Sequence, residues 1–192
     1  SVRTANESSM ILGVPIWWGL ARRFGKDKAL QAALLYSALT TLLLLVLPRG
    51  AFIIAAGFMV IGGLAQGGCT LLTRSLMADV VDDDELTTGS RRSGIFFGLL
   101  LMTSKLGLAA GPVAFGLLQF IGFDAMRGAA NSPQAMVGLS AIFIGAPVAM
   151  CLLATLSLRN YPLDEKAQAA LGAAIDARHA ANSANTRGPS IK

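Results

Sequence analysis

Long runs without a charged residue are the feature that most constrains how this chain can fold. Four runs hold 20 to 31 residues each, and Lys105 is the one charged residue inside them. They cover residues 29–48, 50–73, 93–123 and 128–158. A transmembrane helix needs about 20 apolar residues, and a backbone surrounded by lipid satisfies its hydrogen bonds as a helix. The runs therefore predict an all-α, polytopic transmembrane helix bundle.

A fifth run, at residues 8–21, holds only 14 uncharged residues. It reaches spanning length when the preceding residues are added, and Arg3 and Glu7 would then lie in its first two turns. The expected spans are about 2–21, 29–48, 50–73, 93–121 and 134–158. Residues 1–160 would form the bundle, and residues 161–192 a cytoplasmic tail that is partly disordered.

The overall composition agrees with a membrane protein. Hydrophobic residues make up 54% of the 192 residues and charged residues 14%, against about 25% charged in ordinary soluble domains. The mean hydropathy is +0.59. These values exclude a disordered chain, a coiled coil, a disulfide scaffold and a nucleic-acid-binding domain.

The net charge of +5 comes mostly from basic residues near the ends of the expected spans. Nine of them fall on one side of the membrane in the alternation of spans and loops, against two, Arg49 and Arg127, on the other. The nine are Arg22, Arg23, Lys26, Lys28, Arg74, Arg91, Arg92, Arg159 and Lys166. Cytoplasmic loops carry the excess of Lys and Arg, so this side and the C-terminus are expected in the cytoplasm.

Lys105 is the residue inside the spans that most invites a function. It lies 12 residues after Ser93, or about 18 Å along a helix, and a cation at that depth costs about 3 kcal/mol or more. Such a charge is expected to face a bundle interior. It either serves function or holds helices together in an ion pair, for which Glu7 is the one partner the sequence suggests.

Hydroxyl and amide side chains gather near the same level. Gln66, Thr70 and Thr73 follow an i, i+4, i+7 spacing, which places them on one helix face, and Thr103 is close to Lys105 in sequence. These groups suit either a polyhydroxylated solute or ordinary hydrogen bonds between helices. Glycines four residues apart, Gly63 with Gly67 among them, predict close helix packing.

The segment between residues 74 and 92 concentrates opposite charges. Five carboxylates, Asp79, Asp82, Asp83, Asp84 and Glu85, precede Arg91 and Arg92. The spacing lacks the ligand pattern of a calcium loop, and no base or nucleophile accompanies the acids, so we expect neither a metal site nor an enzyme. A charged cytoplasmic loop, whose ion pairs break and re-form between conformational states, is the better interpretation.

These residues carry a family resemblance. The segment Met77-Ala78-Asp79-Val80-Val81-Asp82 with Glu85, then Gly89-Ser90-Arg91-Arg92-Ser93-Gly94, then Lys105-Leu106-Gly107 resembles the glycoside–pentoside–hexuronide:cation symporters, the melibiose permease-like family of the major facilitator superfamily. The spacing agrees without gaps from Asp79 to Lys105. The resemblance implies helices eight to twelve of a twelve-helix carrier, so the chain would be a C-terminal fragment.

The resemblance also implies roles for individual residues. Lys105 would lie by the central cavity, and we expect Gln66, Thr70 and Thr103 there as well. The expected cytoplasmic gate consists of Asp79, Asp82, Glu85, Arg91 and Arg92. Leu101 and Thr70 stand where melibiose permease has a polar residue and a Trp, which argues against melibiose itself as the solute.

The expected function is sodium- or proton-coupled symport of a sugar or glycoside by alternating access, in a bacterial inner membrane. No cofactor is expected, and the coupling-cation site would lie mainly in the missing N-terminal half. Expected partners are the solute, membrane lipid and that N-terminal half, with no nucleic acid. Two alternatives remain: a facilitator or proton-driven exporter of a non-sugar solute, and a small free-standing membrane scaffold.

Overall fold

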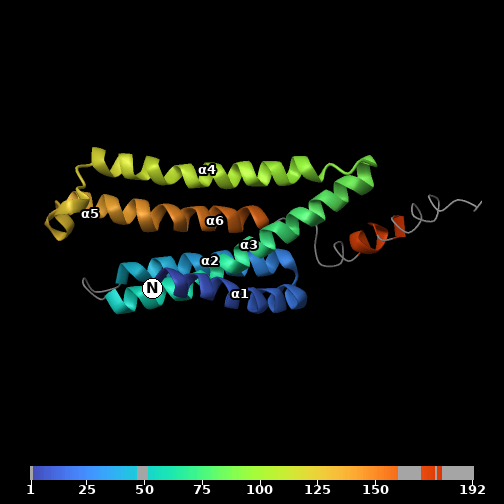
Figure 1. Ribbon diagram of the computed structural model, residues 1–192, viewed down its shortest axis with the longest axis horizontal. Helices are drawn as coiled ribbons and strands as arrows, with labels where there is room; N and C mark the ends of the chain where they lie inside the picture. The colour runs from blue at the N-terminus through green and yellow to red at the C-terminus, as the bar shows by residue number, and fades with distance from the viewer. Residues whose placement is uncertain (1, 47–51, 160–169, 176, 179–192) are drawn as a thin grey trace, which may run out of the picture.

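The computed structural model describes residues 2–46, 52–159, 170–175 and 177–178, and every regular element among them is helical. This confirms the expected all-α class. The elements in chain order are α1 (Val2–Phe24), α2 (Lys26–Leu43), η1 (Leu44–Val46), α3 (Phe52–Thr88), α4 (Ser93–Phe120), η2 (Ala125–Ala130), α5 (Pro133–Ser140), η3 (Ala141–Gly145) and α6 (Ala146–Leu158) (Figure 1).

Two glycines separate the long helices because they adopt a positive φ. Gly25 (φ 93°) follows α1, and its N–H donates to the Ala21 carbonyl. Gly89 (φ 76°) follows α3, and its N–H donates to the Glu85 carbonyl. A left-handed glycine after the last helical residue ends a helix at little steric cost. The chain therefore reverses sharply between α1 and α2 and between α3 and α4.

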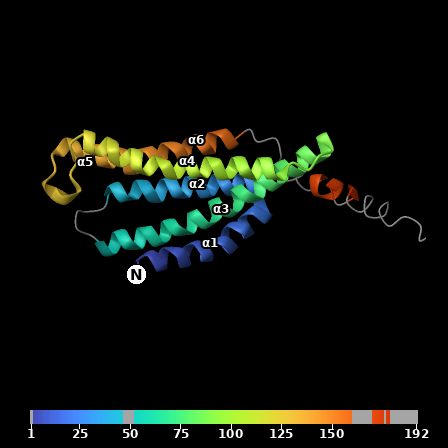
Figure 2. The same ribbon diagram turned by 45° about the horizontal axis from the view of Figure 1, so that its top comes forward.

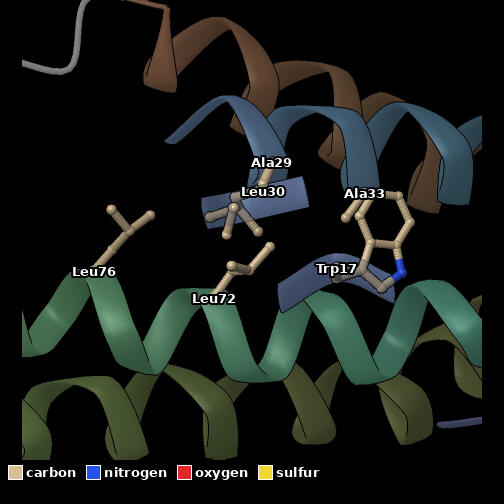
Figure 3. Close-up of a cluster of buried hydrophobic side chains, with 7 residues drawn as sticks. Trp17, Ala29, Leu30, Ala33, Leu72 and Leu76 are labelled. Atoms are coloured by element: carbon tan, nitrogen blue, oxygen red, sulfur yellow. The ribbon is translucent and has the colours of Figure 1, made fainter. Parts of the chain in front are cut away.

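Helices α1, α2 and α3 form the best-packed part of the structure, and α6 lies against α2. The core among the first three consists of Trp17, Ala21, Ala29, Leu30, Ala33, Leu72 and Leu76 (Figure 3). The Trp17 indole also donates a 2.9 Å hydrogen bond to the Leu64 carbonyl, and its ring meets that of Tyr36 edge-on. A wide aromatic side chain thus links α1 to both neighbours.

Helices α1 and α3 approach closely because glycines line their crossing. A Cβ atom on Gly67 would lie 2.1 Å from the Met10 carbonyl oxygen, and one on Gly13 would lie 2.3 Å from the Leu64 carbonyl oxygen. Only glycine leaves room for the opposite backbone at these positions. The structure therefore gives Gly67 the packing role that its spacing predicts, in contact with α1.

Helix α3 corrects the expectation of a charged loop between residues 74 and 92. It continues through all five carboxylates to Thr88, and only residues 89–92 connect it to α4. Thr87 and Thr88 donate their hydroxyls to the carbonyls of Asp83 and Asp84 one turn earlier. The acids mark where the apolar stretch ends, but nothing in this segment breaks a helix before Gly89. Its 37 residues correspond to about 55 Å.

The last apolar stretch forms one nearly continuous helical path. Ser132 caps α5 by accepting the Ala135 N–H at 3.2 Å, and Pro133 occupies the first turn, where its missing N–H costs nothing. A π-helical turn, η3, then joins α5 to α6. Pro147 follows it and has no N–H for the carbonyl four residues earlier, which accounts for the irregular hydrogen bonding there.

Helix α4 is the least covered element. It meets α3 and α5 at only a few places, and Phe115 contacts Phe143 with ring centroids 5.8 Å apart. Leu118 is its buried residue. Figures 1 and 2 show α4 as a long rod on the side of the bundle away from α1.

Four of the helical stretches that the structure describes are long and apolar enough to cross a membrane: Lys26–Val46, Ala56–Thr88, Ser93–Phe120 and Pro133–Leu158. Helix α1 is not among them. The division into a bundle at 1–160 and a tail at 161–192 stays a prediction. Residues 170–175 and 177–178 are helical, and the remaining tail positions lie outside the described residues.

Candidate functional site

A cavity of about 380 Å³ lies between α3 and α4. The two helices converge at the short connection that joins them and open away from it (Figure 1). Helix α3 contributes mostly polar side chains and α4 mostly apolar ones. The lining residues are Cys69, Thr70, Thr73, Arg74, Phe97, Leu100, Leu101 and Ser104.

The structure brings only one of the four predicted cavity residues into this lining. Thr70 lines the cavity, and its hydroxyl donates to the Gln66 carbonyl at 2.9 Å. Gln66, Thr103 and Lys105 are exposed and lie outside the lining. The Thr103 hydroxyl donates to the Leu99 carbonyl. Leu101, which the sequence marks as a departure from the family pattern, does line the cavity.

Lys105 lies on the exposed α4. Among the described residues, no carboxylate is within ion-pair distance of it. The side chain of Glu7, the partner that the sequence suggests, lies outside the part that the structure describes. The role of Lys105 in a cavity stays a prediction.

The acidic end of α3 is tied to α2 by an ion pair that the sequence analysis misses. The Lys26 ammonium donates to both carboxylate oxygens of Asp79 at 2.6 and 2.8 Å. The two side chains are 27% and 13% exposed. In the sequence Lys26 is recognisable only as a basic residue near a span end, and no local pattern links it to a residue 53 positions away.

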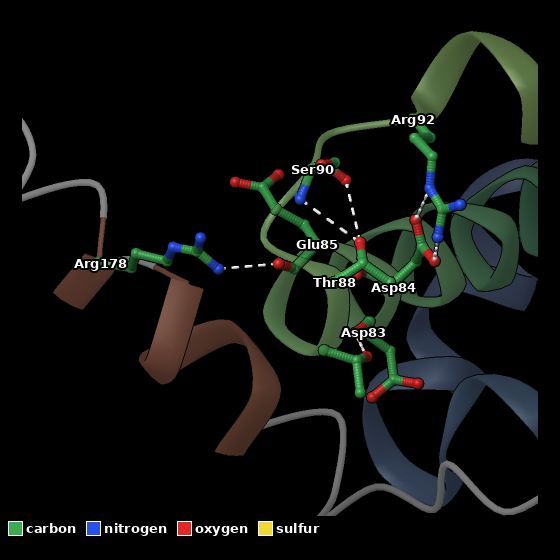
Figure 4. Close-up of polar contacts among 8 residues, drawn as sticks. Asp83, Asp84, Glu85, Thr88, Ser90, Arg92 and Arg178 are labelled. Carbon is green, nitrogen blue, oxygen red and sulfur yellow. Dashed lines mark hydrogen bonds and ion pairs between the residues drawn. The ribbon is translucent and has the colours of Figure 1, made fainter.

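Two of the expected gate residues, Glu85 and Arg92, lie where α3 gives way to α4 (Figure 4). Arg92 binds Asp84 through two hydrogen bonds of 3.0 and 2.5 Å. The hydrogen bond to Asp84 raises the pKa of the Arg92 guanidinium above its ordinary value, and the negative charge of Asp84 is the second cause of this increase. Arg91 lies 3.6 Å from the largely buried carboxylate of Glu85. Asp82 is half-buried and takes no part in these pairs.

A residue of the C-terminal segment also reaches this end of α3. Arg178 donates to the Glu85 carbonyl at 2.7 Å (Figure 4). That carbonyl is in the last turn of the helix, where a cation is favoured by the helix dipole. Leu171 and Ile175, one helical turn apart in the same segment, are buried. The sequence carries no signal for this contact because the tail reads as polar and Ala-rich.

The chemistry of these groups is that of binding and ion pairing. The described residues contain no cluster of three or more His, Cys, Asp or Glu side chains that could hold a metal ion. Three of the five carboxylates near the end of α3, those of Asp79, Asp84 and Glu85, pair with a lysine or an arginine instead. The helix pair α3 and α4 thus has two features. An open, partly apolar cavity lies between the helices, and ion pairs lie at the end where they are connected.

Comparison with known proteins identifies the family of this chain. Residues 4–165 match the MFS/sugar transport protein family. The chain is 30% identical over 164 residues to the human sodium-dependent lysophosphatidylcholine symporter 1, covering 82% of this chain and 29% of that protein. It is 32% identical over 146 residues to an uncharacterized symporter of Bacillus subtilis, covering 74% of this chain and 30% of that protein.

A third relative is an uncharacterized 29.9 kDa protein of Pseudescherichia vulneris, 31% identical over 152 residues, which are 77% of this chain and 54% of that protein. The chain thus spans about three-tenths of the two symporters. The family match bears out the resemblance seen in the sequence. With its apolar helices, the chain is an integral membrane protein, and it belongs to the MFS/sugar transport protein family.

Proposed function

We propose that this chain provides the C-terminal helices of a secondary transporter that couples solute uptake to a cation, by symport and alternating access. The observation that carries the proposal is the pairing of α3 with α4, which enclose an open cavity between residues 69–74 and 97–104 and have ion pairs at their connected end. Facilitator carriers bind their solute near the middle of the membrane between two halves. This half would present α3 and α4 to the solute.

Sodium is the proposed coupling cation, because the human, chicken, zebrafish and frog relatives are named sodium-dependent symporters. The cation itself would bind mainly in the other half of the carrier. A transporter rather than an enzyme accounts for the family match and for carboxylates that are ion-paired. The proposed location is a bacterial inner membrane, with the connected end of α3 and α4 and the C-terminus in the cytoplasm.

The ion pairs would stabilise the state that is closed to the cytoplasm. In the structure the Lys26–Asp79 pair links α2 to α3, and Glu85 and Asp84 of α3 pair with Arg91 and Arg92 of the connection to α4. Opening requires these pairs to separate, as ion pairs do in other switching proteins. Asp82, half-buried on the same helix, would exchange partners when the gate moves.

Two solute classes compete. The family description names sugar transport, whereas the human relative is named for lysophosphatidylcholine. A sugar or glycoside would use the hydroxyls of Thr70 and Thr73, with Gln66, Thr103 and Lys105 meeting it from the open side. A lysolipid would use the apolar surface of α4.

The test is Lys105→Ala in the intact carrier, reconstituted in liposomes with a sodium or proton gradient. A panel of labelled sugars, glycosides and lysolipids identifies the solute first. We expect Lys105→Ala to reduce gradient-driven uptake at least tenfold. Lys28→Ala is the matched control, because Lys28 is exposed at the first turn of α2, and it should retain wild-type uptake. Undiminished uptake with unchanged cation dependence in Lys105→Ala would overturn the assignment of Lys105.

A further inference from the structure

Arg74, one of the basic residues that indicate the orientation of the chain in the membrane, also lines the cavity between α3 and α4. Thr70, four residues before it, lies on the same helix face, and Thr73 lines the same cavity. Opposite them, α4 presents Phe97 and Leu100. The cavity therefore has a cationic, hydroxyl-bearing side and an apolar side.

Nothing in the described part of the chain neutralises Arg74. It is the one charged residue of the lining, no carboxylate lines the cavity, and none of the ion pairs of the described residues involves it. Asp79 lies five positions further along α3, about 140° around the helix axis, and is held by Lys26. Arg74 is exposed and directly follows the charge-free run at residues 50–73, so its guanidinium is accessible to a solute in the cavity.

The hydroxyl groups of the lining are partly committed. Thr70 and Ser104 each donate to the carbonyl one turn earlier, so their oxygens are left to accept hydrogen bonds. The guanidinium of Arg74 is the strong donor of the cavity. Its planar set of N–H groups matches a carboxylate or phosphate, which can accept two parallel hydrogen bonds.

We infer that Arg74 is the anion-binding residue of this cavity and that the solute is an amphiphile with an acidic group. The acidic group binds Arg74, and the apolar part lies along Phe97, Leu100 and Leu101 of α4. The cavity volume of about 380 Å³ is within the roughly 300–1,000 Å³ of ligand sites. This inference rests on the proposed transport function and adds a specificity-determining residue to it.

The experiment compares matched anionic and neutral probes on the purified intact carrier by isothermal titration calorimetry. One pair is 4-nitrophenyl β-D-glucuronide and 4-nitrophenyl β-D-glucoside, which share an apolar ring and differ in the carboxylate. The other is 1-oleoyl lysophosphatidic acid and 1-oleoylglycerol, which differ in the phosphate. Each pair is measured with wild type, Arg74→Gln, Arg74→Lys and the exposed-lysine control Lys28→Gln.

We expect wild type and Lys28→Gln to bind the anionic member of one pair about tenfold more tightly than the neutral member. Arg74→Gln should bind both members equally, with the neutral affinity changed less than twofold, and Arg74→Lys should keep part of the preference. The pair that shows the preference distinguishes a sugar acid from a lipid headgroup. If Arg74→Gln binds neither probe, Arg74→Lys decides: a retained preference supports the inference, and a lost one overturns it.

The inference is overturned if wild type shows no preference in either pair, or if the preference survives in Arg74→Gln. Sodium-driven uptake of a neutral probe without any anion preference would overturn the inference and leave the transport proposal standing. Arg74-dependent anion binding without cation-driven uptake of either probe would support the inference and overturn the transport proposal.

Discussion

The ion pair between Lys26 and Asp79 gives the sharpest test of the proposed cytoplasmic gate. Its N–O distances are 2.6 and 2.8 Å, and its side chains are 27% and 13% exposed. Exposed pairs contribute about 0–1 kcal/mol, whereas breaking a buried pair costs about 3–5 kcal/mol. This pair lies between the two cases, so removing one partner should cost about 2 kcal/mol. Because about 1.4 kcal/mol is tenfold in an equilibrium, Asp79→Asn should shift the gate about 30-fold toward the open state.

The native Cys69 reports that shift, since it lines the cavity and is a half-buried free thiol. In the intact carrier with Cys151→Ser, a membrane-impermeant maleimide applied from the cytoplasmic side should label Cys69 faster in Asp79→Asn and in Lys26→Gln than in the parent protein. The charge exchange Lys26→Asp with Asp79→Lys should restore slow labelling. The reasoning fails if both single variants label within twofold of the parent, or if the exchange labels as fast as the single variants.

Two further predictions concern stability, measured as the Tm of the purified intact carrier. Gly67→Ala should lower the Tm, because its new Cβ would lie 2.1 Å from a backbone oxygen of α1 and overpacking costs about 1–3 kcal/mol. The control is Gly107→Ala, whose Cβ would have nothing within 4 Å. This variant should leave the Tm unchanged or raise it slightly. Equal shifts in the two glycine variants would contradict this. Trp17→Phe removes the indole donor to α3 at 2.9 Å and should cost about 0.5–1.5 kcal/mol, and a Tm equal to wild type would show that the bond contributes nothing.

Charge-free runs locate the helices well because the bilayer imposes a minimum length on them. The expected spans at 29–48, 93–121 and 134–158 correspond closely to Lys26–Val46, Ser93–Phe120 and Pro133–Leu158. The error at residues 74–88 has a physical source. A charge shows where the apolar environment ends, whereas a helix ends where the backbone changes conformation, here at Gly89 with its positive φ.

The sequence predicts the candidate site less completely than it predicts the helices. Of the three residues that helical spacing places on one face, Thr70 and Thr73 line the cavity and Gln66 does not. Arg74, Lys26 and Arg178 were missed as contacts because each depends on a helix distant in sequence. Asp79 and Arg92 are expected gate residues from the sequence, and this role stays a prediction; nothing in the sequence indicates that Lys26 and Asp84 pair with them.

The length of α3 has a mechanical consequence. Its crossing with α1 at Gly67 fixes one point of a helix that continues 12 residues to Asp79, or about 18 Å. A tilt of about 10° about that point would move Asp79 by about 3 Å, enough to separate it from Lys26, while the glycine contact hardly shifts. Helix α3 would thus act as a lever that pivots at its glycine contact with α1 and moves the acidic residues at its far end. A small tilt beside the cavity would therefore lengthen the Lys26–Asp79 ion pair by several times the shift at the glycine contact.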